Sequence, residues 1–479
     1  MDEQIIKYAN KKNLIITEDG LRLLNIYNYK RVIDKLLPED VFVTSEHIKK
    51  ILSSCKVDEQ KSIEKNFCVM DKYDVTNKNL SQGSVPDFLN LFLDKYETIS
   101  NIIKKRVDFN PISISQAKTE IKNKEVHIIG MVYEKRITKN GNMLVTVDDP
   151  TGKINLIVSC KTPDELLSAK EILNDNVLGF KCGVLSKDMF IVKEYFFADI
   201  PYEKKESTLK DDCYVAIIAD THVGSKLFLE DDFIDFIDWL NNKNCQDPEL
   251  VSKIKYLIIA GDLVDGIGIY PKQFNELAIT DIFEQYKLFE EHILKIPEDI
   301  DIFISPGNHD AVRLSDPQPA ITDKFLPRLS TKKNIHLVGS PTWLDLENFK
   351  FLVYHGNSLH GIFGEISGVK TDRPDHALKE LLKRRDLMPQ YGERQMFMPI
   401  EKNFLTIKEI PDVFVCGHIH HHAYSKYKQT YLISASCWQS ITSYQIENGH
   451  IPTLSKVILF NLKNQEITVK DFYKERKWI

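Results

Sequence analysis

Apolar residues form almost unbroken runs in the second half of the chain. Five such runs lie at 214–219, 254–260, 300–305, 351–354 and 413–416. Runs of this length predict strands that are buried on both faces. Stretches with helical periodicity separate them, so the pattern predicts a domain of alternating strands and helices over residues 210–479.

Between residues 112 and 200 the spacing of the apolar residues changes to one typical of short strands. Five short strands are predicted at 126–132, 142–147, 154–158, 177–184 and 190–192. Turn sequences separate the first three strands, Lys139-Asn-Gly141 and Asp149-Pro-Thr-Gly152. A helical stretch at 163–173 falls between the third and fourth strands. Five strands with a helix at that position predict an OB-fold barrel.

Helical periodicity dominates the first hundred residues. It covers 2–37 and a short stretch from 44, and a polar, irregular segment follows. An amphipathic helix is predicted over 86–106. The chain is therefore predicted to be a multidomain α+β protein: a small helical N-terminal domain at 1–55, a linker at 56–85, an amphipathic helix with an OB-fold β-barrel at 86–205, and the strand-rich domain at 210–479.

Composition narrows the class of protein. The 479 residues are 43% hydrophobic and 28% charged, which is typical of globular proteins. A net charge of −6 gives no overall basic footprint for nucleic acid. The eight cysteines are scattered, with no CxxC pair, which favours reduced thiols. No apolar run is long enough for a membrane helix and no signal peptide is visible, so we expect a cytoplasmic protein without membrane partners.

Polar residues able to bind metal follow each of the five buried runs. In chain order they are Asp220 and His222, Asp262, Asn308 with His309 and Asp310, His355, and His418 with His420. Each group alone is also compatible with an ordinary turn or a solvated loop. Their recurrence at five strand ends is the specific signal, because strand ends of one domain converge.

This mixture of carboxylate, amide and imidazole groups suits a pair of divalent metal ions. Two ions about 3.5–4 Å apart activate water and clamp a phosphate during in-line attack. No serine or cysteine nucleophile lies in these motifs. The sequence therefore predicts hydrolysis of a phosphate ester.

The motifs, in this order, resemble those of the calcineurin-like metallophosphoesterase superfamily: Asp220-x-His222, Gly261-Asp262, Gly307-Asn-His-Asp310, His355 and Gly417-His-x-His420. More narrowly, the chain from about residue 86 onward resembles the small, exonuclease subunits of archaeal D-family DNA polymerases. That resemblance rests on Asp265-Gly-Ile-Gly-Ile-Tyr-Pro271, Asp316-Pro-Gln-Pro-Ala320, Leu387-Met-Pro-Gln-Tyr-Gly392 and Trp438-Gln-Ser-Ile-Thr442. It implies a calcineurin-like αββα-sandwich phosphoesterase domain.

The resemblance also implies a role for each motif residue. It assigns Asp220, His222 and His420 to one metal ion and Asn308, His355 and His418 to the other, with Asp262 bridging them. His309 would donate a proton to the leaving oxygen, and Asp310 would orient its ring. Manganese is the expected metal, with magnesium, iron and zinc as alternatives.

The resemblance implies a 3′→5′ proofreading exonuclease that works in a DNA polymerase complex. The expected partners are a large catalytic subunit, DNA with single-stranded or mismatched 3′ ends, and the sliding clamp. Two rival functions stay open: a stand-alone phosphoesterase or repair nuclease, and a catalytically silent scaffold subunit.

Candidate DNA contacts lie outside the metal motifs. Arg136 and Lys139 are predicted on the barrel face, which would bind either a single strand or a protein, and Arg313 follows the third motif. The basic run 383–385 is predicted to be an exposed helix face, with contact to the DNA backbone as the alternative.

Overall fold

The computed structural model describes residues 2–10, 12, 14–17, 21, 33, 42–45, 48 and 65–474, the last range without 79–80, 121–123, 203–204, 244–246, 393–395 and 401. The chain divides into two compact units, residues 1–66 and 67–479. Each unit is described by itself below. None of the helices in these described ranges combines the length and the apolar character that a membrane crossing requires.

The first unit contains strands as well as a helix. Its described elements are α1 (Asp2–Asn10), β1 (Ile15–Ile16) and β2 (Phe42–Val43), and the two strands pair in parallel. Ile5 and Ala9 of α1 are buried against Val43 of β2. The prediction of a purely helical domain was wrong here, because the β-branched and aromatic pairs at 15–16 and 42–43 favour strands. Most of the helical stretches predicted at 21–37 and beyond 44 lie outside the described residues.

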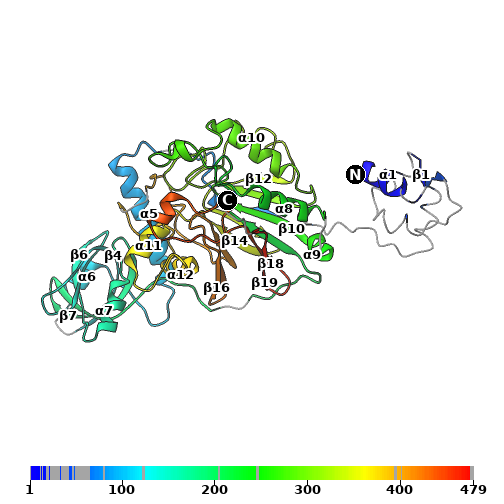
Figure 1. Cartoon of the computed structure of the whole chain (residues 1–479). Coiled ribbons are helices and arrows are strands. Elements are labelled where there is room, and N and C mark those ends of the chain that lie inside the picture. Colours follow the sequence, from blue (N-terminus) through cyan, green and yellow to red (C-terminus); the bar gives the residue numbers. More distant parts are fainter. Residues whose placement is uncertain are drawn as a thin grey trace. The chain divides into compact units, whose positions relative to one another are not determined.

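The barrel of the second unit follows the predicted order of elements. Its strands are β4 (Glu125–Ile137), β5 (Met143–Asp149), β6 (Gly152–Val158), β7 (Val177–Ser186) and β8 (Met189–Phe196), closed in the order β4-β5-β6-β8-β7. Helix α7 (Pro163–Lys170) lies between the third and fourth of these strands, and α6 (Ile114–Ala117) precedes the first. Alternate side chains such as Val145, Leu156 and Phe180 fill the interior. Figure 1 shows these strands in cyan.

Helix α5 (Val85–Ile103) joins the barrel to the rest of the unit. Its N-terminus carries a capping box formed by Ser84 and Asp87. Ile99 and Ile103 on one face pack against the barrel. Lys95 is buried and forms an ion pair with Asp386, Nζ to Oδ2 2.6 Å.

The basic run 383–385 lies in this junction and is not exposed. Arg384 is buried, and its guanidinium bonds to Glu380 and to Asn176 of the barrel domain. Lys383 forms an ion pair with Glu171 at 2.8 Å. The prediction of an exposed or DNA-binding face was therefore wrong, because Glu171 of the barrel domain and Glu380 of α12 form ion pairs with the run.

Part of the predicted linker is an edge strand. β3 (Phe67–Val69) pairs antiparallel with β13 (Thr342–Leu346), and the 3₁₀ turn η1 (Asp71–Tyr73) follows β3. The carboxylate of Asp74 accepts hydrogen bonds from the backbone of Thr76 and Gly339. The polar residues that favoured a linker thus bind the neighbouring loops. This corrects the linker prediction over 67–78.

Two six-stranded sheets form the larger part of the second unit. The first runs β12-β11-β10-β9-β18-β19, with bounds Ile335–Leu337, Asp301–Ser305, Ile254–Ala260, Tyr214–Ile218, Lys456–Asn461 and Ile467–Asp471. The second runs β16-β17-β15-β14-β13-β3, with bounds Ala423–Tyr427, Thr430–Ser434, Val413–Cys416, Phe349–Val353, Thr342–Leu346 and Phe67–Val69. β9 to β12 are mutually parallel, as are β14, β15 and β17.

Alternate side chains of each central strand face different layers. Val215 and Ile217 of β9 pack between the two sheets, where they meet Phe351 of β14. Ala216 and Ile218 face the opposite way, toward α8 (Glu230–Leu240) and α10 (Ile282–Ile293). Burial on both faces explains why these strands are apolar throughout.

Helices also cover the outer face of the second sheet. α11 (Leu359–Glu365) and α12 (Pro374–Arg384) pack against Leu352, Phe414 and Leu432. The short elements α9 (Pro248–Ser252), η2 (Gln273–Glu276) and α13 (Ser443–Glu447) lie in connections. The layers are helix, sheet, sheet and helix, so a mixed α+β chain with a closed barrel is confirmed.

Candidate metal centre

The loops after the parallel strands meet at one edge of the two sheets. Hydrogen bonds join them in pairs: Asp220 N donates to Gly261 O, and Gly417 N donates to His355 O, both at 2.9 Å. The first pair joins β9 to β10, and the second joins β14 to β15. Parallel strands place their carboxyl ends at the same edge, which is why residues far apart in sequence come together.

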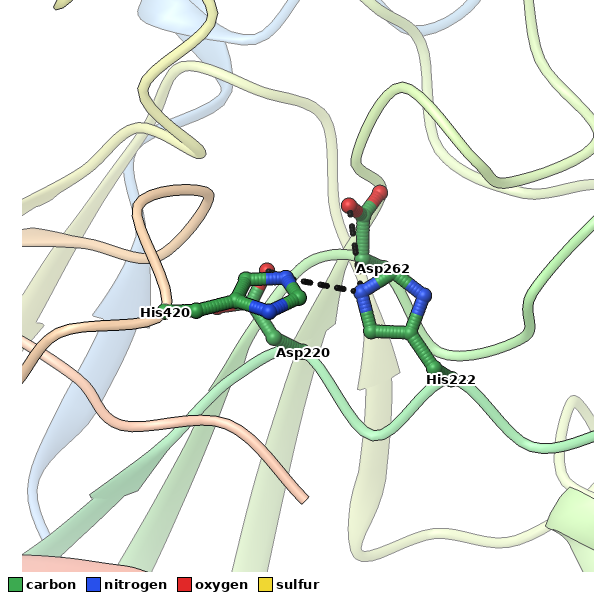
Figure 2. Close-up of side chains that lie close together, drawn as sticks. All are labelled: Asp220, His222, Asp262 and His420. Atoms are coloured by element: carbon green, nitrogen blue, oxygen red, sulfur yellow. Dashed lines mark hydrogen bonds and ion pairs between the residues drawn. The ribbon is translucent and has the colours of Figure 1, made fainter. Parts of the chain in front are cut away.

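Four of the predicted ligands form one buried group. Asp220, His222, Asp262 and His420 each offer a ligand atom, and these atoms lie within 4.8 Å of one another. The Nε2 atoms of His222 and His420 are 2.9 Å apart, and His420 Nε2 is 3.6 Å from Asp220 Oδ1. Figure 2 shows the four side chains converging from three loops.

A second group shares Asp262 with the first. Asp262, His355 and His418 also place ligand atoms within 4.8 Å of one another. His355 Nε2 is 3.2 Å from Asp262 Oδ2 and 3.2 Å from Asn308 Oδ1. The structure therefore brings all seven predicted ligands together, and one carboxylate belongs to both groups.

Glycines allow the loops to approach this closely. A Cβ at Gly261 would lie 2.4 Å from His355 Nδ1, and one at Gly307 would lie 2.2 Å from Asp262 Oδ1. Gly261 also has a φ of +92°, which side-chain-bearing residues rarely adopt. The Gly-Asp and Gly-Asn-His-Asp motifs thus both need glycine for space, and the Gly-Asp motif needs it for conformation as well.

Five of the seven predicted ligands have left-handed backbone conformations. Their φ angles are +55° at Asp220, +47° at His222, +53° at Asp262, +68° at His418 and +57° at His420. Such conformations cost about 1–3 kcal/mol each and cluster at functional sites. The surrounding fold must stabilise these strained conformations, which indicates a functional site.

Burial and charge shift the protonation of these groups in opposite directions. Burial raises the pKa of Asp220 to about 7. Burial also disfavours the ionised form of Asp262, but the neighbouring His355, His309 and His222 together outweigh it and hold the pKa of Asp262 well below its usual range. The pKa of His355 rises to about 10, since Asp262 more than offsets burial. The metal-free centre therefore binds protons that a divalent cation would displace.

His309 lies beside both groups. Its backbone N donates to Asp262 Oδ1 at 2.8 Å, and its ring contacts the ring of His222, with centroids 4.6 Å apart. The ring Nδ1 is 2.7 Å from the backbone oxygen of Asp265. Burial lowers the pKa of His309.

Asp310 does not hold the ring of His309 as predicted. Its carboxylate accepts hydrogen bonds from Gly307 N, Leu263 N and the hydroxyl of Tyr286. Asp310 thus shapes the turn, and the carbonyl of Asp265 holds the ring. Motif spacing could not distinguish these two acceptors, because both lie near His309 only in the folded chain.

Sequence reasoning missed three supporting side chains, of which two contact predicted ligands and the third holds one of those two. Asp265 Oδ1 is 3.2 Å from His222 Nδ1, and Gln439 Nε2 donates to the same oxygen at 2.9 Å. Gln445 Nε2 is 3.0 Å from His420 Nδ1. The signal for Asp265 was its place three residues after Asp262, and Gln439 lies in the Trp438-Gln-Ser-Ile-Thr442 stretch.

The three predicted DNA contacts lie apart from the centre. Arg136 and Lys139 are exposed on the barrel and do not line the cleft at the centre. Arg313 is half-buried, and its Nε donates to Pro317 O at 2.8 Å. Arg313 thus stabilises its own loop, while the barrel positions stay predictions.

The donor set fits divalent cations. Asp220 and Asp262 are almost fully buried, and within the described part of the chain their ion-pair partners are histidines only. Buried carboxylates require a compensating charge. Mixed nitrogen and oxygen donors of this kind suit manganese, iron or zinc. A cleft of about 610 Å³ opens over the two groups, so a substrate could reach them.

Comparison with known proteins agrees with the sequence resemblance. The family model that describes the B subunits of DNA polymerases alpha and epsilon matches residues 215–426. A DNA polymerase II small subunit of Archaeoglobus fulgidus is 34% identical, over 99% of this chain and 96% of its own length. Its counterpart in Thermoplasma acidophilum is 36% identical, over 98% and 92%. A solved archaeal phosphodiesterase is 15% identical over 54% of this chain and 98% of its own, but its TM-score of 0.28 is too low to support a conclusion.

Proposed function

The chain belongs to the family of small subunits of archaeal D-family DNA polymerases, also named DNA polymerase II, and from this premise we propose that it is a metal-dependent 3′→5′ exonuclease. The reaction is hydrolysis of the terminal phosphodiester of a DNA strand. One observation supports it above all others: Asp262 belongs to two ligand groups at once. A shared carboxylate is what a two-metal phosphoesterase centre requires.

Two ions would be held by the two groups. Asp220, His222 and His420 would hold one, Asn308, His355 and His418 the other, and Asp262 both. When bound, a pair of divalent cations neutralises phosphate charge and lowers the pKa of water. Manganese is the proposed metal, and magnesium, iron and zinc are the alternatives.

The remaining chemistry belongs to His309. Its Nδ1 bonds to the carbonyl of Asp265, which leaves Nε2 as the nitrogen that can exchange a proton with the substrate. His309 would donate that proton to the 3′ oxygen that leaves. Asp262 fixes the backbone of His309, so the proton donor and the shared ligand keep a constant spacing.

The proposed partner is a large catalytic polymerase subunit. With a net charge of −6, this chain by itself is expected to have low affinity for DNA. The large subunit would supply that grip and deliver frayed or mismatched 3′ ends, and the sliding clamp is a further proposed partner. The barrel, with Arg136 and Lys139, would face either the DNA or the large subunit.

We also propose a three-part organisation for the chain. Residues 1–55 would form the N-terminal domain, 86–205 the amphipathic helix with an OB-fold barrel, and 210–479 a calcineurin-like phosphoesterase domain. The closed barrel and the paired sheets support the second and third parts.

Degradation of a 3′-mismatched primer in manganese tests the proposal. We expect the full chain with its large subunit to shorten the primer from its 3′ end. His309→Ala and Asp262→Ala should abolish shortening, and His376→Ala is the matched control because that ring is 44% exposed and outside the cleft.

Two outcomes would favour the rival functions. No shortening by the wild-type complex would favour a silent scaffold subunit. Hydrolysis of mononucleotides or phosphoproteins without DNA shortening would favour a stand-alone phosphoesterase.

A further inference from the structure

The cleft over the metal centre has aromatic walls and little positive charge. Among the described residues that line it there is no lysine or arginine, so the polar groups that accompany the carboxylates are imidazoles, amides and hydroxyls. Proteins that bind duplex DNA grip its phosphates with lysine and arginine. The cleft lacks that means of holding a duplex.

Aromatic side chains lie on different sides of the ligands. Tyr270 lies next to His309, with ring centroids 6.2 Å apart, and its hydroxyl bonds to Glu276 Oε2 at 3.0 Å. Phe363 contacts the ring of His360, which in turn contacts His418 at 5.1 Å. Rings therefore reach the cleft beside both the proton donor and a predicted ligand.

Tyr444 is the most exposed aromatic residue of the cleft. Tyr444 is 61% exposed although it lines the cavity. It lies on α13, which begins with a capping box between Thr442 and Gln445. The same Gln445 contacts His420, so the backbone of Tyr444 is held at a constant distance from the centre. An exposed aromatic ring at such a fixed position is available to stack on a planar group of a ligand.

We propose that Tyr444 stacks on the base of the terminal, unpaired nucleotide while the phosphate of that nucleotide reaches the metal centre. This rests on the proposed function and adds to it the residue that would recognise the unpaired end, by stacking on its base. A base exposes both of its faces only when it has left the duplex stack, and the cleft has no lysine or arginine to hold a duplex, so an unpaired end is the expected substrate. The cavity of about 610 Å³ is in the size range of sites for small ligands and suits an extruded nucleotide. Stacking on an aromatic side chain is tolerant of base identity, as removal of any mismatch requires.

Two measurements on the full chain in complex with its large subunit test the role of Tyr444. The first is manganese-dependent shortening of a single-stranded oligonucleotide. Tyr444→Ala should raise KM about 10-fold and leave kcat unchanged, and Tyr444→Phe should behave as wild type. Tyr424→Ala is the matched control, since Tyr424 is 45% exposed and does not line the cleft.

An abasic terminal nucleotide makes the first measurement specific. We expect it to raise the KM of the wild type by the same factor and to leave the KM of Tyr444→Ala unchanged. A structural role of Tyr444 would instead make the two effects multiply. Equal KM for wild type and Tyr444→Ala would overturn the proposal.

The second measurement is binding without turnover. The probe is an oligonucleotide with 2-aminopurine at its 3′ end, titrated in calcium, with fluorescence quenching reporting the stack. Quenching by wild type and by Tyr444→Phe but not by Tyr444→Ala supports the stacking site even if no variant cleaves DNA, which would refute only the exonuclease. Cleavage that depends on His309 together with unchanged quenching in Tyr444→Ala would overturn the stacking site and leave the exonuclease intact. Absence of quenching by the wild type would also overturn the stacking site.

Discussion

Asp262 organises the centre at the scale of single residues. Its Oδ1 accepts the backbone N–H of His309, and its Oδ2 lies 3.2 Å from His355 Nε2. The same carboxylate belongs to both ligand groups. One side chain therefore fixes the spacing of the two groups and of the proposed proton donor.

The division of roles between His309 and His355 is testable. His309→Ala should lower kcat about 10²–10⁴-fold, because it removes general acid catalysis, and should leave the metal content unchanged. His355→Ala should lower the metal content itself. Steady-state kinetics and elemental analysis of the same samples measure both quantities, and loss of metal in His309→Ala would refute the assignment.

Asp310 should make the stability of the metal-free protein depend on pH. Burial raises the pKa of Asp310 to about 7, above the value of about 3.9 for an unfolded chain. The folded state thus binds the extra proton between these values, and the associated stability is lost as pH rises from about 4 through 7. The effect is at most about 4 kcal/mol.

Urea unfolding of the wild type and Asp310→Asn in EDTA measures this effect. Relative to the variant, the wild type should become less stable as pH rises from 4 to 8. A difference in unfolding free energy that stays constant over this range would show that Asp310 is ionised throughout.

Residue types and their order along the chain predicted which ligands would meet, but not their supports. Asp220 and His418 lie 198 positions apart, yet both follow a buried strand, and that rule alone placed them together. Asp310 and Asp265 both follow buried strands as well. Which of them contacts His309 depends on the path of the turns, and sequence spacing does not specify that path.

At the scale of elements, the turns between each strand and its predicted ligand determine how the ligands are placed. Gly261 separates β10 from Asp262 and has no room for a side chain, since Pro306 O lies 2.8 Å from the place of its Cβ. The strain of a positive φ and the steric clash act together there.

Gly261→Ala should therefore lower both stability and metal affinity. Strain alone costs about 1–3 kcal/mol, and the clash with His355 would displace a predicted ligand. Gly268→Ala is the matched control, because Gly268 has a φ of +77° and nothing within 4 Å of its Cβ position. Thermal unfolding and metal titration of both variants separate strain from clash. Normal metal affinity in Gly261→Ala would show that the approach of these loops is not needed.

The junction between α5 and the loop after α12 contains a buried ion pair. The side chains of Lys95 and Asp386 are 4% and 3% exposed. Lys95→Met should cost about 3–5 kcal/mol, because it leaves a buried carboxylate without its partner. Lys95→Met combined with Asp386→Leu should recover most of that loss.

Denaturant unfolding of the two single variants and the double variant measures the coupling. Lys287→Met serves as the control, since the pair of Lys287 with Glu284 is more than half exposed and should contribute little to stability. Additive losses in the double variant would mean that the pair does not stabilise the junction.

Element types were predictable where one period dominates. Apolar and polar residues alternate along the barrel strands, and the central strands are apolar throughout. Both kinds of strand could therefore be predicted from the sequence. The segment 67–78 and the basic run 383–385 were misassigned because polar residues that bind other parts of the protein resemble solvated ones. Thr76 accepts from Ala320 N, and Lys383 reaches Glu171, contacts that no local pattern reveals.

At the scale of the whole molecule, the layered fold brings the strand ends of the two sheets together. β9, β10 and β11 belong to one sheet, and β14 and β15 to the other. The apolar layer between the sheets holds the two edges in register. The ligand groups therefore depend on the packing of the entire unit from Phe67 onward, and a change that separates the sheets should abolish both.

Anomalous X-ray diffraction from crystals grown with manganese tests the central claim most directly. We expect two peaks, one among Asp220, His222 and His420 and one among Asn308, His355 and His418, both in contact with Asp262. A single peak, or peaks only at other surfaces of the chain, would contradict the two-metal account.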